Sequence, residues 1–347
     1  MPLAFHPDFV LGDSPAMRKL LAAMTPTVCS HLDVLIVGET GTGKELIAEM
    51  VHASGPTAKG PFVAINCAAI PNELLEAELF GIEARVATGV DPRPGVFVKA
   101  HGGSLFLDEI GDMADALQAK LLRALEQREV LPLGGQKPRK VELRVISASN
   151  KPIGEFVQQG RFRPDLYYRL RGLQFHVPPL RERAEDVAPL ALAFAERAAR
   201  RYGKRIAGIS RPTFDLLLEH LWPGNVRELK SEVERAVLLC PDGAALDGTH
   251  FGPVRWQVEQ RRLGGGHAFQ SGATAPAHDH APERGETAPF RTLRERFDEV
   301  EREALREALN RTGGNQTEAA KLLGITRNGL AMKVKRLGAR RGRGTGK

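Results

Sequence analysis

A glycine-rich stretch has the residue types and spacing of a phosphate-binding loop. It matches G-x-x-x-x-G-K and reads Gly38-Glu39-Thr40-Gly41-Thr42-Gly43-Lys44. Glycines let backbone N–H groups curl around a phosphate, and the N-terminus of a following helix adds partial positive charge. Lys44 is expected to reach the β- and γ-phosphates of a bound ATP. Glu45 stands where a Ser or Thr usually supplies a hydroxyl to Mg²⁺, so that ligand must come from elsewhere or be water.

Two neighbouring carboxylates complete the chemistry of nucleotide hydrolysis. Asp108 and Glu109 follow the apolar run Leu105-Phe106-Leu107, about 65 residues after the loop. A carboxylate at the end of such a strand can orient Mg²⁺, and its neighbour can activate a water molecule. We therefore expect Asp108 to hold Mg²⁺ and Glu109 to act as the base.

The segments around these residues predict an α/β fold. Short apolar runs at 33–37, 61–65, 104–107 and 141–147 read as buried strands, and residues 44–52 have helical spacing. Continuous apolar strands that alternate with helices indicate a parallel sheet covered on both faces. From about 187 to 240 the pattern is helical only. Residues 264–289 are rich in Gly, Ala, Pro and His, which predicts a flexible linker.

Composition restricts the class of protein, and charge points to a partner. The chain has 347 residues, 42% hydrophobic and 26% charged, an ordinary globular balance with a net charge of +7. Residues 315–347 hold nine Lys/Arg against one acid, so the preceding 314 carry −1. A near-neutral body with a basic end favours a polyanion partner there. Three cysteines without metal-ligand spacing favour a reduced, cytoplasmic setting, and no apolar run approaches the ~18 residues of a membrane span.

The basic end has the pattern of a helix-turn-helix. Residues 292–309 predict an amphipathic helix, 317–323 a short one, and 327–337 a last helix with Thr326 as its N-cap. Leu330, Val334 and Leu337 would form the buried stripe of that last helix. The residues expected to contact double-stranded DNA are Thr326, Arg327, Asn328, Lys333 and Arg336.

Several spaced strings together resemble the bacterial enhancer-binding proteins, the activators of sigma-54 RNA polymerase. The likeness covers residues 10–240, through the loop with its Glu45, and resumes at the C-terminal module, which is similar to a Fis-type helix-turn-helix. The strings that carry it are Ala64-Ile65-Asn66-Cys67-Ala68, Glu78-Leu79-Phe80-Gly81, Gly102 to Ile110, Phe162 to Leu170, Pro178 to Arg183 and Trp222 to Leu229. The resemblance implies an AAA+ P-loop ATPase with a parallel sheet and a helical lid, followed by a small all-α module.

The resemblance also implies roles for individual residues. Asn66 would restrain Glu109, and Asn150 would be the first sensor of the nucleotide. Arg227 would be the second sensor. Arg163 and Arg169 would reach the γ-phosphate held by a neighbouring subunit, which implies a ring, taken as a hexamer, in addition to a DNA-binding dimer.

One departure from the family pattern concerns the loop that contacts sigma-54. The family's Gly-Ala-Phe-Thr-Gly-Ala is replaced here by Arg85-Val86-Ala87-Thr88-Gly89-Val90. A Phe buries far more apolar area than the Ala at position 87, worth ~2 kcal/mol at a packed contact. The loop length is kept, which favours remodelling over loss of the contact. The P-loop begins at residue 38, so we also expect either a missing N-terminal regulatory domain or a regulatory partner protein.

Two functions remain open at this point. The favoured one is an ATP-hydrolysing regulator that binds DNA and remodels sigma-54 RNA polymerase. The alternative is a DNA-binding regulator whose AAA+ domain acts independently of sigma-54, and the Fis-type end disfavours a helicase or clamp loader. The predicted division is an α/β subdomain at 1–182, a lid at 183–252, a linker at 253–290 and the DNA-binding module with its basic tail at 291–347.

Overall fold

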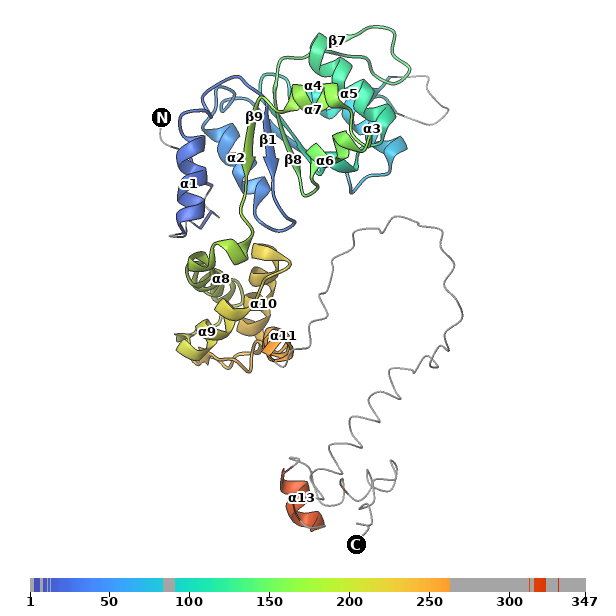
Figure 1. Ribbon diagram of the computed structural model, residues 1–347. Coiled ribbons are helices and arrows are strands. Elements are labelled where there is room, and N and C mark those ends of the chain that lie inside the picture. Colours follow the sequence, from blue (N-terminus) through green and yellow to red (C-terminus); the bar gives the residue numbers. More distant parts are fainter. Residues whose placement is uncertain are drawn as a thin grey trace, which may run out of the picture. The chain divides into compact units, whose positions relative to one another are not determined.

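The computed structural model describes residues 3–6, 9, 10, 12, 14–83, 91–262, 312, 315–322 and 330. The chain divides into two compact units, Met1–Gly272 and Ala273–Lys347, which are described separately. The first holds an α/β layer and a helical lid (Figure 1). In the second, the described helix is α13, Gln316–Leu322. Ala319, Ala320 and Leu330 are buried there.

The centre of the first unit is a five-stranded parallel sheet in the order β2-β5-β8-β1-β9. Its strands are β1 Val34–Val37, β2 Phe62–Asn66, β5 Ser104–Asp108, β8 Arg144–Ser149 and β9 Leu173–His176. The four predicted strands are present, with boundaries shifted by one to three residues. β9 pairs with β1 at the sheet edge, and the sequence did not predict it.

Helices cover both faces of this sheet, as the apolar runs predict. Alternate residues of β5 enter different cores: Leu105 and Leu107 pack on one face, and Phe106 packs on the other. The Phe106 face is covered by α1 Pro15–Met24 and α2 Lys44–Ala53. The opposite face is covered by α3 Asn72–Phe80, α4 Val96–Lys99, α5 Asp115–Gln127, α6 Ile153–Gln158 and α7 Pro164–Leu170 (Figure 1).

Short elements connect these helices and strands. They are β3 Gly81–Ile82, β4 Arg93–Pro94, β6 Glu129–Val130, β7 Arg139–Lys140, β10 Gly208–Ile209 and β11 Ala245–Leu246, with single turns at Ile110–Asp112, Leu180–Glu182 and Ala184–Asp186. Val141, predicted to begin a strand, donates its N–H to Arg128 O at 2.9 Å beside the β6-β7 pair. The core strand β8 therefore begins three residues later.

The lid contains α8 Val187–Arg201, α9 Arg211–Glu219, α10 Asn225–Leu239 and α11 Gly252–Arg262. α8 and α10 form its centre, where Phe194 and Val233 lie in one apolar core. The predicted linker boundary at residue 253 is too early. Residues 252–262 are helical, and Val254 and Val258 of α11 are buried, Val254 within the lid core.

Candidate functional site

The glycine-rich loop lies between β1 and α2, as the motif requires. Gly41 and Gly43 have φ angles of +79° and +101°, a region that side chains with a Cβ rarely adopt. A Cβ on Gly41 would lie 2.3 Å from Gly224 O of the lid, whereas at Gly43 no described atom lies within 4 Å. One glycine therefore permits a close approach of the lid, and the other leaves space for a ligand.

Lys44 is the first residue of α2 and is buried, with 6% of its side chain exposed. Its Nζ donates to Gly38 O at 2.9 Å and Glu39 O at 3.2 Å, and lies 3.6 Å from Glu109 Oε1. The ammonium group is thus held at the mouth of the loop by two carbonyls and one carboxylate. A phosphate group there would replace these partners with stronger ionic ones.

The carboxylates follow β5 at the same edge of the sheet. Asp108 accepts hydrogen bonds from Glu109 N at 3.0 Å and from Asn66 Nδ2 at 3.1 Å. Burial raises the pKa of Asp108 above its ordinary value, and the nearby Lys44 opposes this effect. Two further carboxylates, Glu45 and Glu109, lie close by in sequence or in space.

Asn66 does not contact Glu109 here, which differs from the expectation that it restrains that residue. Its Nδ2 donates to Asp108, and its Oδ1 accepts from Ala68 N and Ala69 N at 2.9 and 3.1 Å. The Glu109 side chain pairs with Lys44 and with the backbone N–H of Asn150 instead.

Asn150 joins the loop to Glu109. Its backbone N–H donates to Glu109 Oε2 at 2.9 Å, and its Nδ2 donates to Thr40 Oγ1 at 2.9 Å. Asn150 follows β8, the strand between β5 and β1. The predicted first sensor therefore lies between the loop and the carboxylates.

The lid contacts three consecutive residues of the loop through their carbonyl oxygens. Asn225 Nδ2 donates to Thr40 O at 3.0 Å, Arg227 N to Gly41 O at 3.2 Å, and Arg183 Nη2 to Thr42 O at 2.8 Å. Asn225 is fully buried and Arg183 nearly so. The lid thus fixes the backbone of the loop from the side away from β1.

An ion pair also connects the loop to the lid. The two terminal nitrogens of Arg181, Nη1 and Nη2, donate to the Glu39 carboxylate at 2.8 and 2.6 Å. Asn225 Nδ2 also donates to Glu39, at 3.1 Å. The hydrogen bond from Arg181 is the main cause that lowers the pKa of Glu39, and burial opposes it.

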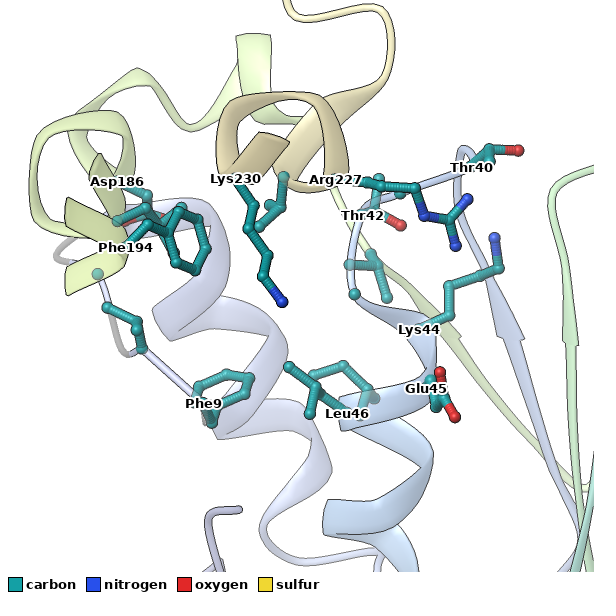
Figure 2. Close-up of a pocket in the computed structure, with 18 of the residues that line it drawn as sticks. Phe9, Thr40, Thr42, Lys44, Glu45, Leu46, Asp186, Phe194, Arg227 and Lys230 are labelled. Carbon is teal, nitrogen blue, oxygen red and sulfur yellow. The ribbon is translucent and has the colours of Figure 1, made fainter. Parts of the chain in front are cut away.

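Lys44, Asp108, Glu109 and Arg227 line one cavity of about 520 Å³. Figure 2 shows Lys44 and Arg227 pointing toward the same part of it, with Lys230 also directed inward. The opposite end is apolar, with Phe9, Val10 and Phe194. The cavity has a charged end for phosphates and an apolar end able to hold a nucleobase.

The sequence patterns did not predict the apolar end of the cavity or the hydrogen bonds from the lid to the loop. Phe9, Val10 and Phe194 come from three separate segments, so no short motif marks them. Asn225 stands in a string that carries the family resemblance, but the sequence singled out only Arg227 there. Asn225 has a φ of +52°, a conformation in which Asn is several-fold enriched.

The two arginines expected to act on a neighbouring subunit do not line this cavity. Arg163 pairs with Asp165, with Nη2 at 2.8 Å from Oδ2, and both side chains are exposed. Arg169, in α7, donates from Nη1 to Asp33 Oδ2 at 2.8 Å. Asp33 immediately precedes β1, so this pair lies at the end of the strand opposite the loop.

Some predicted residues lie outside the described ones. These are the sigma-54 contact loop, Arg85 to Val90, and the DNA-contacting residues Thr326, Arg327, Asn328, Lys333 and Arg336. Leu330, predicted to be buried in the last helix, is fully buried. None of the helices described is long and apolar enough to cross a membrane.

Family models match three consecutive parts of the chain. They are the Sigma-54 interaction domain over residues 10–176, the AAA+ ATPase lid domain over 181–262, and the Bacterial regulatory protein, Fis family, over 291–337. The lid match ends where α11 ends.

Individual proteins are similar along nearly the whole chain. The transcriptional regulatory protein ZraR of Klebsiella oxytoca is 45% identical over 94% of this chain and 68% of its own. The nitrogen fixation protein AnfA of Azotobacter vinelandii is 39% identical over 96% of this chain and 58% of its own. The crystal structure of NtrX from Brucella abortus in complex with ATP has a TM-score of 0.67 at 31% identity, covering 95% of this chain and 70% of that one.

Proposed function

The chain belongs to the sigma-54-dependent transcriptional activators, ATP-hydrolysing AAA+ regulators that bind DNA, and from this premise we propose which residues perform each step. The observation that carries the proposal is the single cavity on which Lys44, Asp108, Glu109 and Arg227 converge. The comparisons favour sigma-54 activation and give no support to a regulator that acts independently of sigma-54.

The triphosphate of ATP binds along the glycine-rich loop, residues 38–44, with Glu45 at the start of the helix behind it. Lys44 exchanges its contacts with Gly38 O, Glu39 O and Glu109 for phosphate oxygens. Arg227 faces the same end of the cavity from the lid (Figure 2). Both cations stabilise the charge that develops on the γ-phosphate during transfer to water.

Glu109 is the base that activates the attacking water. Its carboxylate is held from two sides, by the Asn150 N–H and by the ammonium of Lys44. When a phosphate takes Lys44 away, Glu109 loses one partner and gains freedom to accept a proton. Asn150, which also contacts Thr40, reports the occupancy of the loop to Glu109.

Mg²⁺ fits this site through Asp108. The carboxylate lies in the same cavity as Lys44, and no trio of His, Cys, Asp or Glu among the described residues could hold a metal by itself. Mg²⁺ in nucleotide sites typically takes one or two carboxylates, phosphate oxygens and several waters, which suits a lone Asp108 beside a triphosphate. The ion would neutralise phosphate charge.

A ring of subunits explains why Arg163 and Arg169 are remote from the cavity of their own chain. Asp33 and Gly38 are separated by the length of β1, roughly 16 Å at the rise of a strand. Arg169, bound to Asp33, therefore cannot serve its own ATP. In a ring, taken as a hexamer, both arginines act on the ATP of the next subunit.

The C-terminal module binds a double-stranded DNA site as a dimer. Arg327 and Asn328 read base edges, and Thr326, Lys333 and Arg336 position the helix on the backbone. The loop at residues 85–90 contacts sigma-54 with Ala87 in place of the Phe of the family's loop. These steps place the protein in the cytoplasm, and its control would come from a regulatory partner protein or from a segment joined to it.

Transcription from a sigma-54 promoter with purified components tests the proposal. We expect open complexes that require ATP and that Lys44→Ala abolishes. Ala87→Phe restores the apolar side chain of the family loop and should increase open complexes at equal ATPase rate. If the wild-type chain and Ala87→Phe both hydrolyse ATP but neither forms open complexes, the proposed sigma-54 contact is wrong.

A further inference from the structure

Asp33 is a buried carboxylate with two distinct hydrogen-bond partners. Its Oδ1 accepts from Val145 N of β8 at 2.9 Å, and its Oδ2 accepts from Arg169 Nη1 at 2.8 Å. Only 2% of the Asp33 side chain is exposed, against 32% for Arg169. The backbone bond to β8 fixes the orientation of the carboxylate, so Arg169 is held by an acceptor that does not move.

Another cation lies near this carboxylate without bonding to it. Arg144 is buried and donates to carbonyls, from Nε to Leu32 O at 2.9 Å and from Nη1 to Val28 O at 2.8 Å. Among the described residues, Arg169 is thus the cation that forms an ion pair with Asp33. A buried charge of this kind makes a strong, directional contact because water does not screen it.

The two arginines near α7 are held in different ways. Arg163 uses Nε and Nη2 together on Asp165, at 3.2 and 2.8 Å, and that carboxylate is itself exposed. Arg169 contacts Asp33 with Nη1 alone, and its second contact, from Nη2 to Leu125 O, is long at 3.5 Å. A guanidinium has five N–H donors, so Arg169 keeps donors available at its exposed side.

We propose that Asp33 is a positioning residue that holds Arg169 ready for the γ-phosphate of an ATP bound to a neighbouring copy of the chain. The inference rests on the proposed ring. Asp33 does not touch ATP and acts only through Arg169. Preorganised charge accelerates phosphoryl transfer because no reorientation is needed as charge develops. A fixed carboxylate behind the guanidinium provides that order.

The test uses the full chain and mixed assemblies. Asp33→Asn keeps an oxygen for Val145 N but removes the charge that holds Arg169. We expect its ATPase rate alone to fall about tenfold, the scale of outer partners that orient a functional group. Mixed with Glu109→Gln subunits, which bind ATP without hydrolysing it and carry an intact Arg169, the Asp33→Asn subunits should regain most of their activity.

Rescue by mixing separates positioning from a structural role. A subunit damaged in its own cavity stays inactive beside any neighbour, so Asp33→Asn without rescue overturns the proposal. An increased rate for Asp33→Asn alone would also overturn it, because Asp33 would then be restraining Arg169. If Asp33→Asn does not fold, Asp33→Ser retains an acceptor for Val145 N and enters the same experiment.

Two further variants make the outcomes distinguishable. Arg169→Ala should be rescued by the same Glu109→Gln partner, and failure of that rescue overturns the ring arrangement together with this inference. Rescue of Arg169→Ala but not of Asp33→Asn overturns the inference alone. Asp242→Asn, the same change at the exposed partner of Arg205 outside the cavity, should leave the rate within about twofold. In the Arg169→Ala background, Asp33→Asn should cause no further loss.

Discussion

At the residue scale, the contacts of Lys44 show how its ammonium is positioned for a phosphate. Its ammonium is nearly buried and rests on two carbonyls and a carboxylate, none of which matches the charge of a triphosphate. Because the ammonium is already held in place, the exchange of these weak partners for phosphate costs little side-chain conformational entropy.

Lys44→Ala should weaken ATP binding by about 100-fold or more, because charge-assisted hydrogen bonds of about 1.5–3 kcal/mol each are lost. Calorimetric titration with ATP and Mg²⁺ measures this change. Lys120→Ala is the matched control, since Lys120 pairs with Glu76 outside the cavity. Retained affinity in Lys44→Ala would refute the assignment of the phosphate-binding loop.

Much of the site could be predicted from residue patterns, and the misses have physical causes. The loop, Asp108, Glu109 and Asn150 lie together because parallel strands place their carboxyl ends at the same edge of the sheet, and Arg227 reaches the same cavity from the lid. The orientation of Asn66 was not predictable, since it is set by hydrogen bonds to Asp108, Ala68 N and Ala69 N that no short motif specifies.

At the element scale, the edge strand and the lid show what pattern reading overlooks. β9 alternates Leu173, Gln174, Phe175 and His176, so it lacks the continuous apolar run that marks the other strands of the sheet. The continuous apolar runs of β1 and β5, in contrast, are typical of buried strands. The residues of α11 are mostly polar, which favours a linker, but Val254 and Val258 on this helix are buried.

The ion pair between Glu39 and Arg181 predicts a pH-dependent contribution to stability. The pKa of Glu39 is lowered in the folded chain, so the pair stabilises at pH above the ordinary Glu range and is lost as pH falls through the lowered pKa. Because both side chains are 41% exposed, the contribution to the free energy of unfolding is below about 1 kcal/mol.

Arg181→Ala should therefore lower Tm slightly at pH 7, and the difference from wild type should shrink on acidification and vanish below the lowered pKa of Glu39. It should also raise the KM for ATP, since Glu39 belongs to the loop. Thermal unfolding at several pH values and steady-state ATPase assays give both readouts. Arg205→Ala removes a comparable pair with Asp242, distant from the loop, and should leave KM unchanged. An equal KM change in both variants would contradict a role for this tie.

At the scale of the whole molecule, the ATPase unit and the DNA-binding module differ in net charge. The basic excess lies at residues 315–347, whereas the preceding chain is near neutral. Non-specific attraction to the DNA backbone therefore acts mainly at the C-terminal module.

Arg327→Ala should reduce binding to the specific DNA site by about 1–3 kcal/mol and change non-specific binding much less. Titration of labelled specific and random duplexes at two salt concentrations gives the ratio and the salt dependence. Arg343→Ala, in the basic tail, is the control and should lower both affinities alike. An equal loss on both duplexes in Arg327→Ala would make Arg327 a phosphate contact only.

The three lid contacts to the carbonyls of Thr40, Gly41 and Thr42 have a thermodynamic consequence. A loop with glycines at 38, 41 and 43 loses much conformational entropy when it becomes ordered. Here the hydrogen bonds from the lid restrain the loop backbone without needing any contact to a phosphate. The binding of ATP is then free of most of this entropic penalty, and a chain without its lid would meet the penalty at every binding event.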